Sequence, residues 1–191
     1  MEPIDITEFV RATDEDVSKI GEESELLRSI RQNLTALLSS EIPEGAFIPR
    51  TDKYAMNLIH APKDRSFSII AGVWQPGQTT PIHDHLTWAL VGVYKGKEKE
   101  SIFRRIDDYK NEKLAKLEMV SEKVNGPGHI TVLGEKGIHR VDNPFGEPTW
   151  TIHVYGRDIG NVERHSYDPV SGEISTFTSG YCNVLRDLDE F

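Results

Sequence analysis

The sequence predicts a mainly β fold, a sandwich or a double-sheet jelly-roll barrel, with a helical cap at its N-terminus. From about Tyr54 the chain alternates short strand-like runs with turns, a pattern typical of sandwiches and barrels. Before Gly45, apolar residues recur at helical spacing instead. A chain of 191 residues is long enough for one domain with a real core. We therefore expect a single domain over 1–191, with the cap in 1–45 and the barrel in 50–191.

The cap is predicted from a start signal, an apolar stripe and a stop signal. Thr13 precedes three acidic residues, a pattern of helix N-termini. The apolar positions that follow at helical spacing are Val17, Ile20, Leu26, Leu27, Ile30, Leu34, Leu37 and Leu38. Pro43 and Gly45 then break the pattern.

The barrel is predicted from runs that end at turn residues such as Gln75-Pro76-Gly77. The predicted strands are 66–74, 87–94, 98–105, 129–133, 138–141, 150–155 and 172–177. The charge-rich run 110–123 is expected to form a solvated hairpin and not a binding patch. A jelly-roll barrel of this kind can hold a ligand in its mouth.

Composition narrows the classes of partner. A formal net charge of -9 argues against nucleic acid or an anionic membrane as a partner. No apolar run approaches the roughly 20 residues of a membrane span. Cys182 is the only cysteine, which excludes an internal disulfide and fits a reducing compartment. The N-terminal residues 1–5 lack a signal-peptide pattern, so we expect a cytoplasmic protein.

Three histidines form a candidate metal site. His83 and His85 are two residues apart, so on a strand their imidazoles would share one face. His139, from another strand, could complete the site, since neutral imidazole is the commonest protein metal ligand. Asp84 alternates with the pair and should face away. A metal held without a carboxylate keeps its full positive charge, which favours anionic ligands such as a thiolate.

The surroundings of these histidines partly match the two cupin motifs. Gly77 lies six residues before His83, as in the first motif, but the usual glutamate would fall near Ala89 or Leu90, which cannot bind metal. In the second motif, Gly128 lies eleven residues before His139. The usual Pro-x-Gly is replaced by Gly134-Glu135-Lys136.

A more specific pattern runs through 139–143, 147–148 and 151–155. Its His-Arg-Val-Asp-Asn, Glu-Pro and Thr-Ile-His-Val-Tyr segments resemble the cysteine-dioxygenase-type thiol dioxygenases, and the resemblance extends from about 54 to 181. It implies a cupin barrel, a double-stranded β-helix, that holds non-haem iron(II) on His83, His85 and His139. It also implies oxidation of a small thiol to its sulfinic acid with dioxygen.

Thr151, His153 and Tyr155 alternate and should share one strand face. Together they can form a hydrogen-bonded relay in which Tyr155 donates to dioxygen or substrate. The family relay has serine first, and the threonine here keeps the hydroxyl. The alternative is a polar strand face that points to solvent.

Three further positions distinguish subfamilies. The animal cysteine dioxygenases carry a cysteine near Leu90 that crosslinks to the relay tyrosine, and an arginine at the position of Met56 that binds the substrate carboxylate. Neither residue is present, so we expect no crosslink and place Met56 on the pocket floor. The bacterial 3-mercaptopropionate dioxygenases have an arginine nine residues after the tyrosine, here Arg164, although they usually have glutamine near Met56.

Arginine suits a carboxylate because its planar fork binds both oxygens. The alternative for Arg164 is a surface loop position paired with Glu163 or Asp158. His60, His129 and His165 have no partner at ligand spacing and are interpreted as ordinary polar residues.

The leading hypothesis is therefore an iron(II)-dependent dioxygenase whose partners are dioxygen and a small carboxylate-bearing thiol. Two alternatives stay open: a metal-dependent cupin dioxygenase that acts on a non-thiol substrate, and a non-catalytic cupin that binds a structural metal such as zinc. The sequence leaves the physiological thiol, the oligomeric state and the pathway open.

Overall fold

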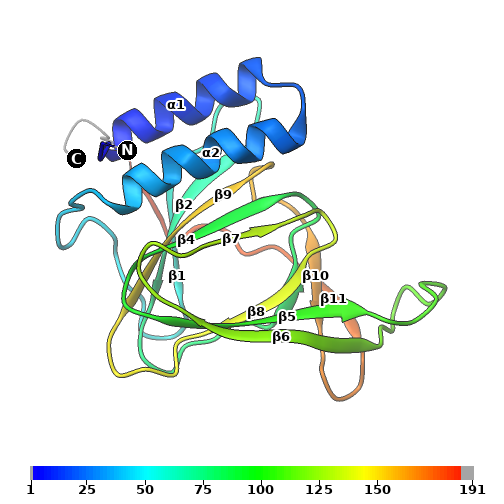
Figure 1. The fold of residues 1–191 in the computed structure, drawn as a ribbon. Coiled ribbons are helices and arrows are strands. Elements are labelled where there is room, and N and C mark those ends of the chain that lie inside the picture. The colour runs from blue at the N-terminus through cyan, green and yellow to red at the C-terminus, as the bar shows by residue number, and fades with distance from the viewer. Residues whose placement is uncertain (1, 186–191) are drawn as a thin grey trace.

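The computed structural model describes residues 2–185, which form two helices and twelve strands (Figure 1). The helices are α1 (Ile6–Lys19) and α2 (Glu23–Leu38). The strands are β1 (Ala55–His60), β2 (Ser68–Trp74), β3 (Ile82–Asp84), β4 (Ala89–Lys95), β5 (Glu98–Arg105), β6 (Leu117–Asn125), β7 (Ile130–Leu133), β8 (Ile138–Asp142), β9 (Thr149–Tyr155), β10 (Arg164–Tyr167), β11 (Ile174–Phe177) and β12 (Asn183–Val184). Met1 and the last six positions of the predicted barrel lie outside the described residues.

The strands form two six-stranded sheets that face each other around the interior of a barrel (Figure 1). One sheet has the order β12-β1-β2-β9-β4-β7 and the other β11-β10-β3-β8-β5-β6. Strands distant in sequence are neighbours, as β2 and β9 are over seven consecutive residue pairs. The mainly β, double-stranded β-helix fold with a helical cap is thereby confirmed. Its treatment as one domain over 1–191 remains a prediction.

The cap contains two helices where one continuous stripe was predicted. Its N-terminal signal was assigned to the wrong residue, because Asp5 caps α1 by accepting a bond from the backbone N–H of Glu8 at 2.7 Å. Thr13 lies inside α1 and donates to the carbonyl of Phe9 at 2.9 Å, so its hydroxyl is satisfied within the helix. Neither described helix is long and apolar enough to cross a membrane.

The cap lies across the outer face of the sheet that contains β2, β9 and β4 (Figure 1). Ile30, Leu34 and Leu37 of α2 are fully buried against it. The contact is close at Gly92 of β4, where a Cβ atom would come within 2.8 Å of Leu38. The cap thus covers the outside of the barrel and leaves its interior to the functional side chains.

The predicted strands agree with observed ones, with shifts of one or two residues at most ends, and 98–105 coincides with β5. The segment 110–123 supplies the turn and most of β6, in a largely exposed hairpin with β5. Strands β1, β3, β10 and β12 were not among the predicted strands. In β10 the sequence Arg-His-Ser-Tyr has no apolar alternation, so only its pairing with β3 and β11 defines it as a strand.

Candidate metal centre and substrate pocket

Three buried imidazoles meet inside the barrel. His83 of β3 and His139 of β8 are partners on neighbouring strands of one sheet, and their ring centroids are 4.7 Å apart. His85 follows the end of β3 and is 4.9 Å from each of them. The chain turns at Leu86, which has a φ of 55°. One potential ligand atom from each histidine lies within 4.8 Å of the others, so the structure brings the predicted cluster together although His85 is not on the strand.

The hydrogen bonds of the cluster leave nitrogens free to bind a metal. His83 Nδ1 lies 3.0 Å from the carbonyl of Pro81, and His139 Nδ1 lies 2.8 Å from Glu100 Oε1. Both partners are acceptors, so each Nδ1 carries the proton and each Nε2 keeps a free lone pair. Both ring nitrogens of His85 are buried without a hydrogen-bond partner. Buried polar atoms without partners are rare and costly, and a metal ion would satisfy one of these two nitrogens.

The protonation states also suit metal binding. Burial holds the pKa of His83 and of His85 well below its usual range. Both imidazoles are therefore neutral at physiological pH, which is the form that binds metal. A set of three imidazole nitrogens fits iron(II) or another divalent transition metal.

Glu100 is a functional candidate that the sequence reasoning missed. Its Oε2 accepts bonds from Thr131 Oγ1 at 2.6 Å and Asn125 Nδ2 at 3.1 Å, while Oε1 faces His139. Burial alone would raise the pKa of Glu100, but its hydrogen bonds, above all the one from His139, leave that pKa lowered. A carboxylate thus lies directly behind one candidate ligand. The sequence signal was the pair Glu98 and Glu100, two acids on one face of a strand, both of which are buried.

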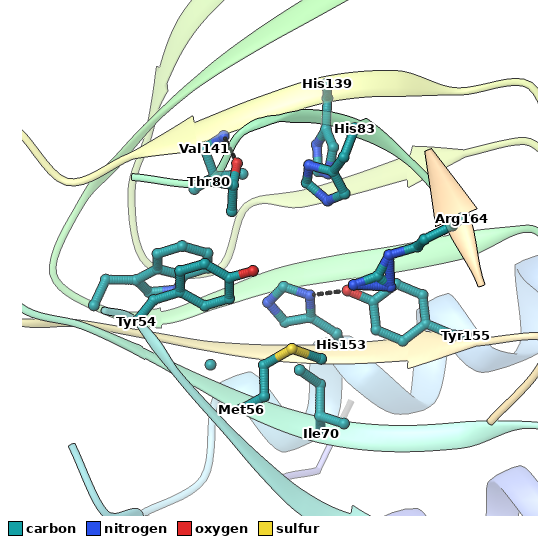
Figure 2. A pocket seen from close by; sticks show the side chains of 12 residues that line it. Tyr54, Met56, Ile70, Thr80, His83, His139, Val141, His153, Tyr155 and Arg164 are labelled. Carbon is teal, nitrogen blue, oxygen red and sulfur yellow. Dashed lines mark hydrogen bonds between the residues drawn. The ribbon is translucent and has the colours of Figure 1, made fainter. Parts of the chain in front are cut away.

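The residues Thr151, His153 and Tyr155 of β9 form a continuous hydrogen-bonded row. Thr151 Oγ1 is 2.7 Å from His153 Nε2. His153 Nδ1 is 2.7 Å from the Tyr155 hydroxyl (Figure 2). Burial lowers the pKa of His153 to about 3, so this imidazole is neutral and has one donor and one acceptor nitrogen. The ring of Tyr155 lies 5.1 Å from that of His85, which connects the row to the histidine cluster.

Trp74 sets the direction of this row. Its indole Nε1–H, which can only donate, bonds to Thr151 Oγ1 at 3.0 Å. The remaining acceptors near the threonine hydroxyl are His153 Nε2 at 2.7 Å and the carbonyl of Gly72 at 3.5 Å. The shorter contact favours donation from Thr151 to His153. His153 then donates from Nδ1 to the oxygen of Tyr155, and the phenolic proton is left to point into the pocket.

Arg164 enters the same pocket from β10 (Figure 2). The residue is 2% exposed, and its guanidinium lies 4.7 Å from the ring centre of Phe177. One hydrogen bond is formed, a long one of 3.4 Å to the carbonyl of Ile159, and the buried Nε has no partner. Arg164 is therefore not a surface residue paired with Asp158, which was the alternative. Asp158 pairs with Arg65 and accepts a hydrogen bond from Tyr181.

The wall opposite the histidines is apolar and aromatic. Met56 and Ile70 line it next to Tyr54, whose ring stacks on Trp74 with centroids 4.5 Å apart (Figure 2). A second, outer depression shares Tyr54 and Met56 with the inner pocket, so these side chains lie between the two. Among the described residues that line the inner pocket, Arg164 carries the only fixed charge and there is no carboxylate.

The remaining sequence candidates lie elsewhere. Leu90 is fully buried in the core, and Cys182 donates from Sγ to the carbonyl of Met56 at 3.1 Å on the outer side of the pocket. His60 contacts Asp14 at 3.3 Å, outside the pocket. His165 points away from the pocket toward Asp84, as described below.

The solved structures that match this chain are remote from it. An oxalate oxidase in complex with glycolate is 17% identical over 63% of this chain, with a TM-score of 0.47. A cupin superfamily protein from Desulfitobacterium hafniense DCB-2 is 11% identical over 61% of this chain and 90% of its own length, with a TM-score of 0.43. A Cupin 2 conserved barrel domain protein from Salinispora arenicola CNS-205 is 14% identical over 61% of this chain and 87% of its own, also with a TM-score of 0.43.

The match covers 43% of the length of one oxalate oxidase chain and 59% of another, so the similarity extends to about half of those proteins. A family comparison is more informative about this chain. The family described as cysteine dioxygenase type I matches residues 31–168, a span that includes the three histidines, the relay and Arg164. Because this match covers well over half of the chain, the protein belongs to the cysteine dioxygenase type I family, a family of cupin thiol dioxygenases with a metal site.

Proposed function

We propose that this protein oxidises a small carboxylate-bearing thiol to its sulfinic acid with dioxygen. His83, His85 and His139 would hold iron(II), and the bound iron would supply the redox chemistry and the Lewis acidity that favours a thiolate. The observation that carries the proposal is the buried, incompletely bonded guanidinium of Arg164 in the same pocket as the histidine cluster. We also propose a cytoplasmic location, in keeping with the single cysteine.

Arg164 would anchor the substrate carboxylate. Arginine carries five N–H donors and remains charged in proteins, yet the one bond formed here is the long contact with Ile159. Burial lowers the pKa of Arg164, because the charged form loses water without gaining a full set of partners. A carboxylate that accepts two parallel hydrogen bonds would satisfy the guanidinium and neutralise its charge.

The same pocket disfavours an amino group on the substrate. An ammonium group loses its hydration on entry and needs an anionic or several acceptor partners. The wall formed by Met56, Ile70 and Tyr54 offers a thioether, an alkyl group and a phenol, and none of the described residues that line the pocket is a carboxylate. We therefore propose that the protein acts like the bacterial 3-mercaptopropionate dioxygenases. It would prefer 3-mercaptopropionate to cysteine.

Tyr155 would donate a hydrogen bond to dioxygen or to the substrate. Burial raises the pKa of Tyr155 above its usual range, so the phenol keeps its proton at neutral pH. The direction of the relay, from Thr151 through His153, presents this proton to the pocket. The protein thus places an anchor for the carboxylate and a proton donor in the same pocket.

The test is oxygen-electrode screening of iron-loaded protein with cysteine, 3-mercaptopropionate, cysteamine and mercaptosuccinate. We expect the highest kcat/KM for 3-mercaptopropionate, a product heavier than the thiol by two oxygen atoms, and one dioxygen consumed per product. His139→Ala should lose iron binding and oxygen uptake together. Tightly bound, stoichiometric zinc in the purified protein with no thiol-dependent oxygen uptake would contradict the proposal and favour a non-catalytic cupin. Iron without a response to any thiol would favour a different substrate.

A further inference from the structure

We propose that Asp84 is a positioning residue for the substrate anchor, because its carboxylate holds strand β10, and with it Arg164, in register with the histidine cluster. The inference rests on the proposed function, in which Arg164 binds the carboxylate of the thiol. Asp84 lies between two of the candidate metal ligands in the chain, but its side chain contacts neither.

Asp84 is 4% exposed and accepts three hydrogen bonds from β10. Oδ1 accepts from the backbone N–H of His165 at 2.8 Å. Oδ2 accepts from His165 Nδ1 and from the Tyr167 hydroxyl, each at 2.8 Å. Burial, together with the bond to Asp84, raises the pKa of Tyr167, so the phenol remains a donor. Among the described residues, all donors to this buried carboxylate therefore come from the strand that begins with Arg164.

The backbone pairing at this place is short. Strand β3 has three residues, and its contact with β10 has two register pairs, His83 with Ser166 and Ile82 with Tyr167. Beyond Asp84 the chain leaves the sheet at His85 to reach the cluster. The two register pairs do not include His165, and the Asp84 side chain accepts its backbone N–H. The carboxylate thus extends the pairing up to the residue next to Arg164.

Alternation along both strands explains why one carboxylate can act on both parts of the site. On β3, Asp84 faces away from the cluster that its neighbours form. On β10, His165 and Tyr167 face Asp84, while Arg164 faces the pocket. A link on the outer side of the sheet therefore fixes the distance between the metal ligands and the guanidinium on the inner side. That distance decides whether a thiol and a carboxylate on one small molecule can bind together.

The test measures binding of two thiols to zinc-loaded protein, which binds thiols without oxidising them. 3-Mercaptopropionate carries a carboxylate, and 2-mercaptoethanol is a thiol of similar size without one. Asp84→Leu removes all three acceptors and should weaken 3-mercaptopropionate binding roughly tenfold or more. The Kd of 2-mercaptoethanol should change less than about twofold, since its contacts do not include Arg164. Asp84→Asn keeps an acceptor for the His165 N–H and should fall between Asp84→Leu and the unmodified protein.

Two other variants separate positioning from folding. Tyr167→Phe removes one donor without altering residues next to the histidine cluster, and should lower the preference for 3-mercaptopropionate roughly threefold even if Asp84→Leu fails to fold. Ser166→Ala, between the two donors, removes a side chain that bonds only to the carbonyl of Ser175 at 3.4 Å and should leave both Kd values unchanged. Zinc stoichiometry and the circular dichroism spectrum should match the unmodified protein in each variant used.

The outcomes distinguish the inference from the proposed function. If the unmodified protein binds neither thiol, the proposed function is wrong and the role of Asp84 falls with it. If the unmodified protein prefers 3-mercaptopropionate and the folded variants keep that preference, the role of Asp84 alone is wrong. Equal weakening of both thiols would also overturn it, because that result would indicate damage to the histidine cluster and not to the position of Arg164.

Discussion

Glu100 Oε1 lies 2.8 Å from His139 Nδ1, so a buried carboxylate supports one of the three candidate metal ligands from behind. The bond fixes the ring orientation and the tautomer of His139 and increases the donor strength of its Nε2. The Nδ1 of His83 faces the neutral carbonyl of Pro81 instead of a carboxylate, and His85 has no hydrogen-bond partner among the described residues. The three imidazoles are therefore not equivalent, although the candidate ligands include no carboxylate.

Replacing Glu100 with Gln should weaken metal binding. The amide cannot supply the negative charge, and loss of such a partner typically costs about 10- to 100-fold in metal affinity. Competition with a chelator, using cobalt(II) as a spectroscopic probe, would measure the change. Glu122→Gln is a matched control, because Glu122 is exposed and bonds to Ser101 and Lys99 instead of a histidine. Equal cobalt affinity in the Glu100 variant and the control would rule out this role.

Replacing Arg164 with Gln should separate thiols by their carboxylate. We expect kcat/KM for 3-mercaptopropionate to fall roughly 30-fold or more, about 2 kcal/mol, because a desolvated charge pair is lost. Oxygen uptake with 2-mercaptoethanol, measured in the same assay, should change little. Arg65→Gln is the control, since Arg65 is exposed and contacts Asp158. A similar fall for both thiols would show that Arg164 supports the fold and not the carboxylate.

Strand alternation was sufficient to predict the groups that lie on one strand. Thr151, His153 and Tyr155 are on β9, a strand between β2 and β4, and a two-residue period places all three on one face. The same rule placed the side chain of Asp84 on the other face of the strand from that of His83. These relations depend on local geometry alone, so the sequence contains them.

Relations between strands were not predictable in the same way. Glu100 reaches His139 because β5 pairs with β8 in a register that sets Ile102 opposite His139. Trp74 reaches Thr151 because β2 pairs with β9. Neither register is encoded by any local pattern, since it follows from how the whole barrel closes. The polar strand that carries Arg164 was missed for the same reason.

Replacing Trp74 with Phe should impair the relay through Thr151. The variant keeps the aromatic stack on Tyr54 but removes the N–H that directs the threonine proton toward His153. We expect kcat to fall roughly tenfold, about 1.4 kcal/mol, with KM changed less than about twofold. In a double-mutant cycle, adding this change to Thr151→Val should cause little further loss. Additive losses would show that Trp74 acts on another group, and Trp150→Phe, on the outer side of β9, serves as the control.

Replacing Glu98 with Gln should stabilise the protein at alkaline pH. Burial, reinforced by the nearby charge of Glu100, raises the pKa of Glu98 from 4.5 to about 8, and its buried Oε2 has no partner. The folded state therefore holds this proton more tightly than the unfolded state. The resulting stability is fully present below pH 4.5 and is lost as the pH rises through 8, at up to about 1.4 kcal/mol per pH unit.

Glutamine stays neutral over this range, so the variant should lack that decline. Urea unfolding of the metal-free protein at pH 5, 6, 7, 8 and 9 would measure it, and the free energy of unfolding should fall less steeply with pH in Glu98→Gln than in the unmodified protein. Glu118→Gln provides the comparison, because Glu118 is exposed and pairs with Arg104 on the outer hairpin. Parallel curves for Glu98→Gln and the unmodified protein would mean that Glu98 is already ionised in the folded state, which its unpartnered, desolvated oxygen makes unfavourable.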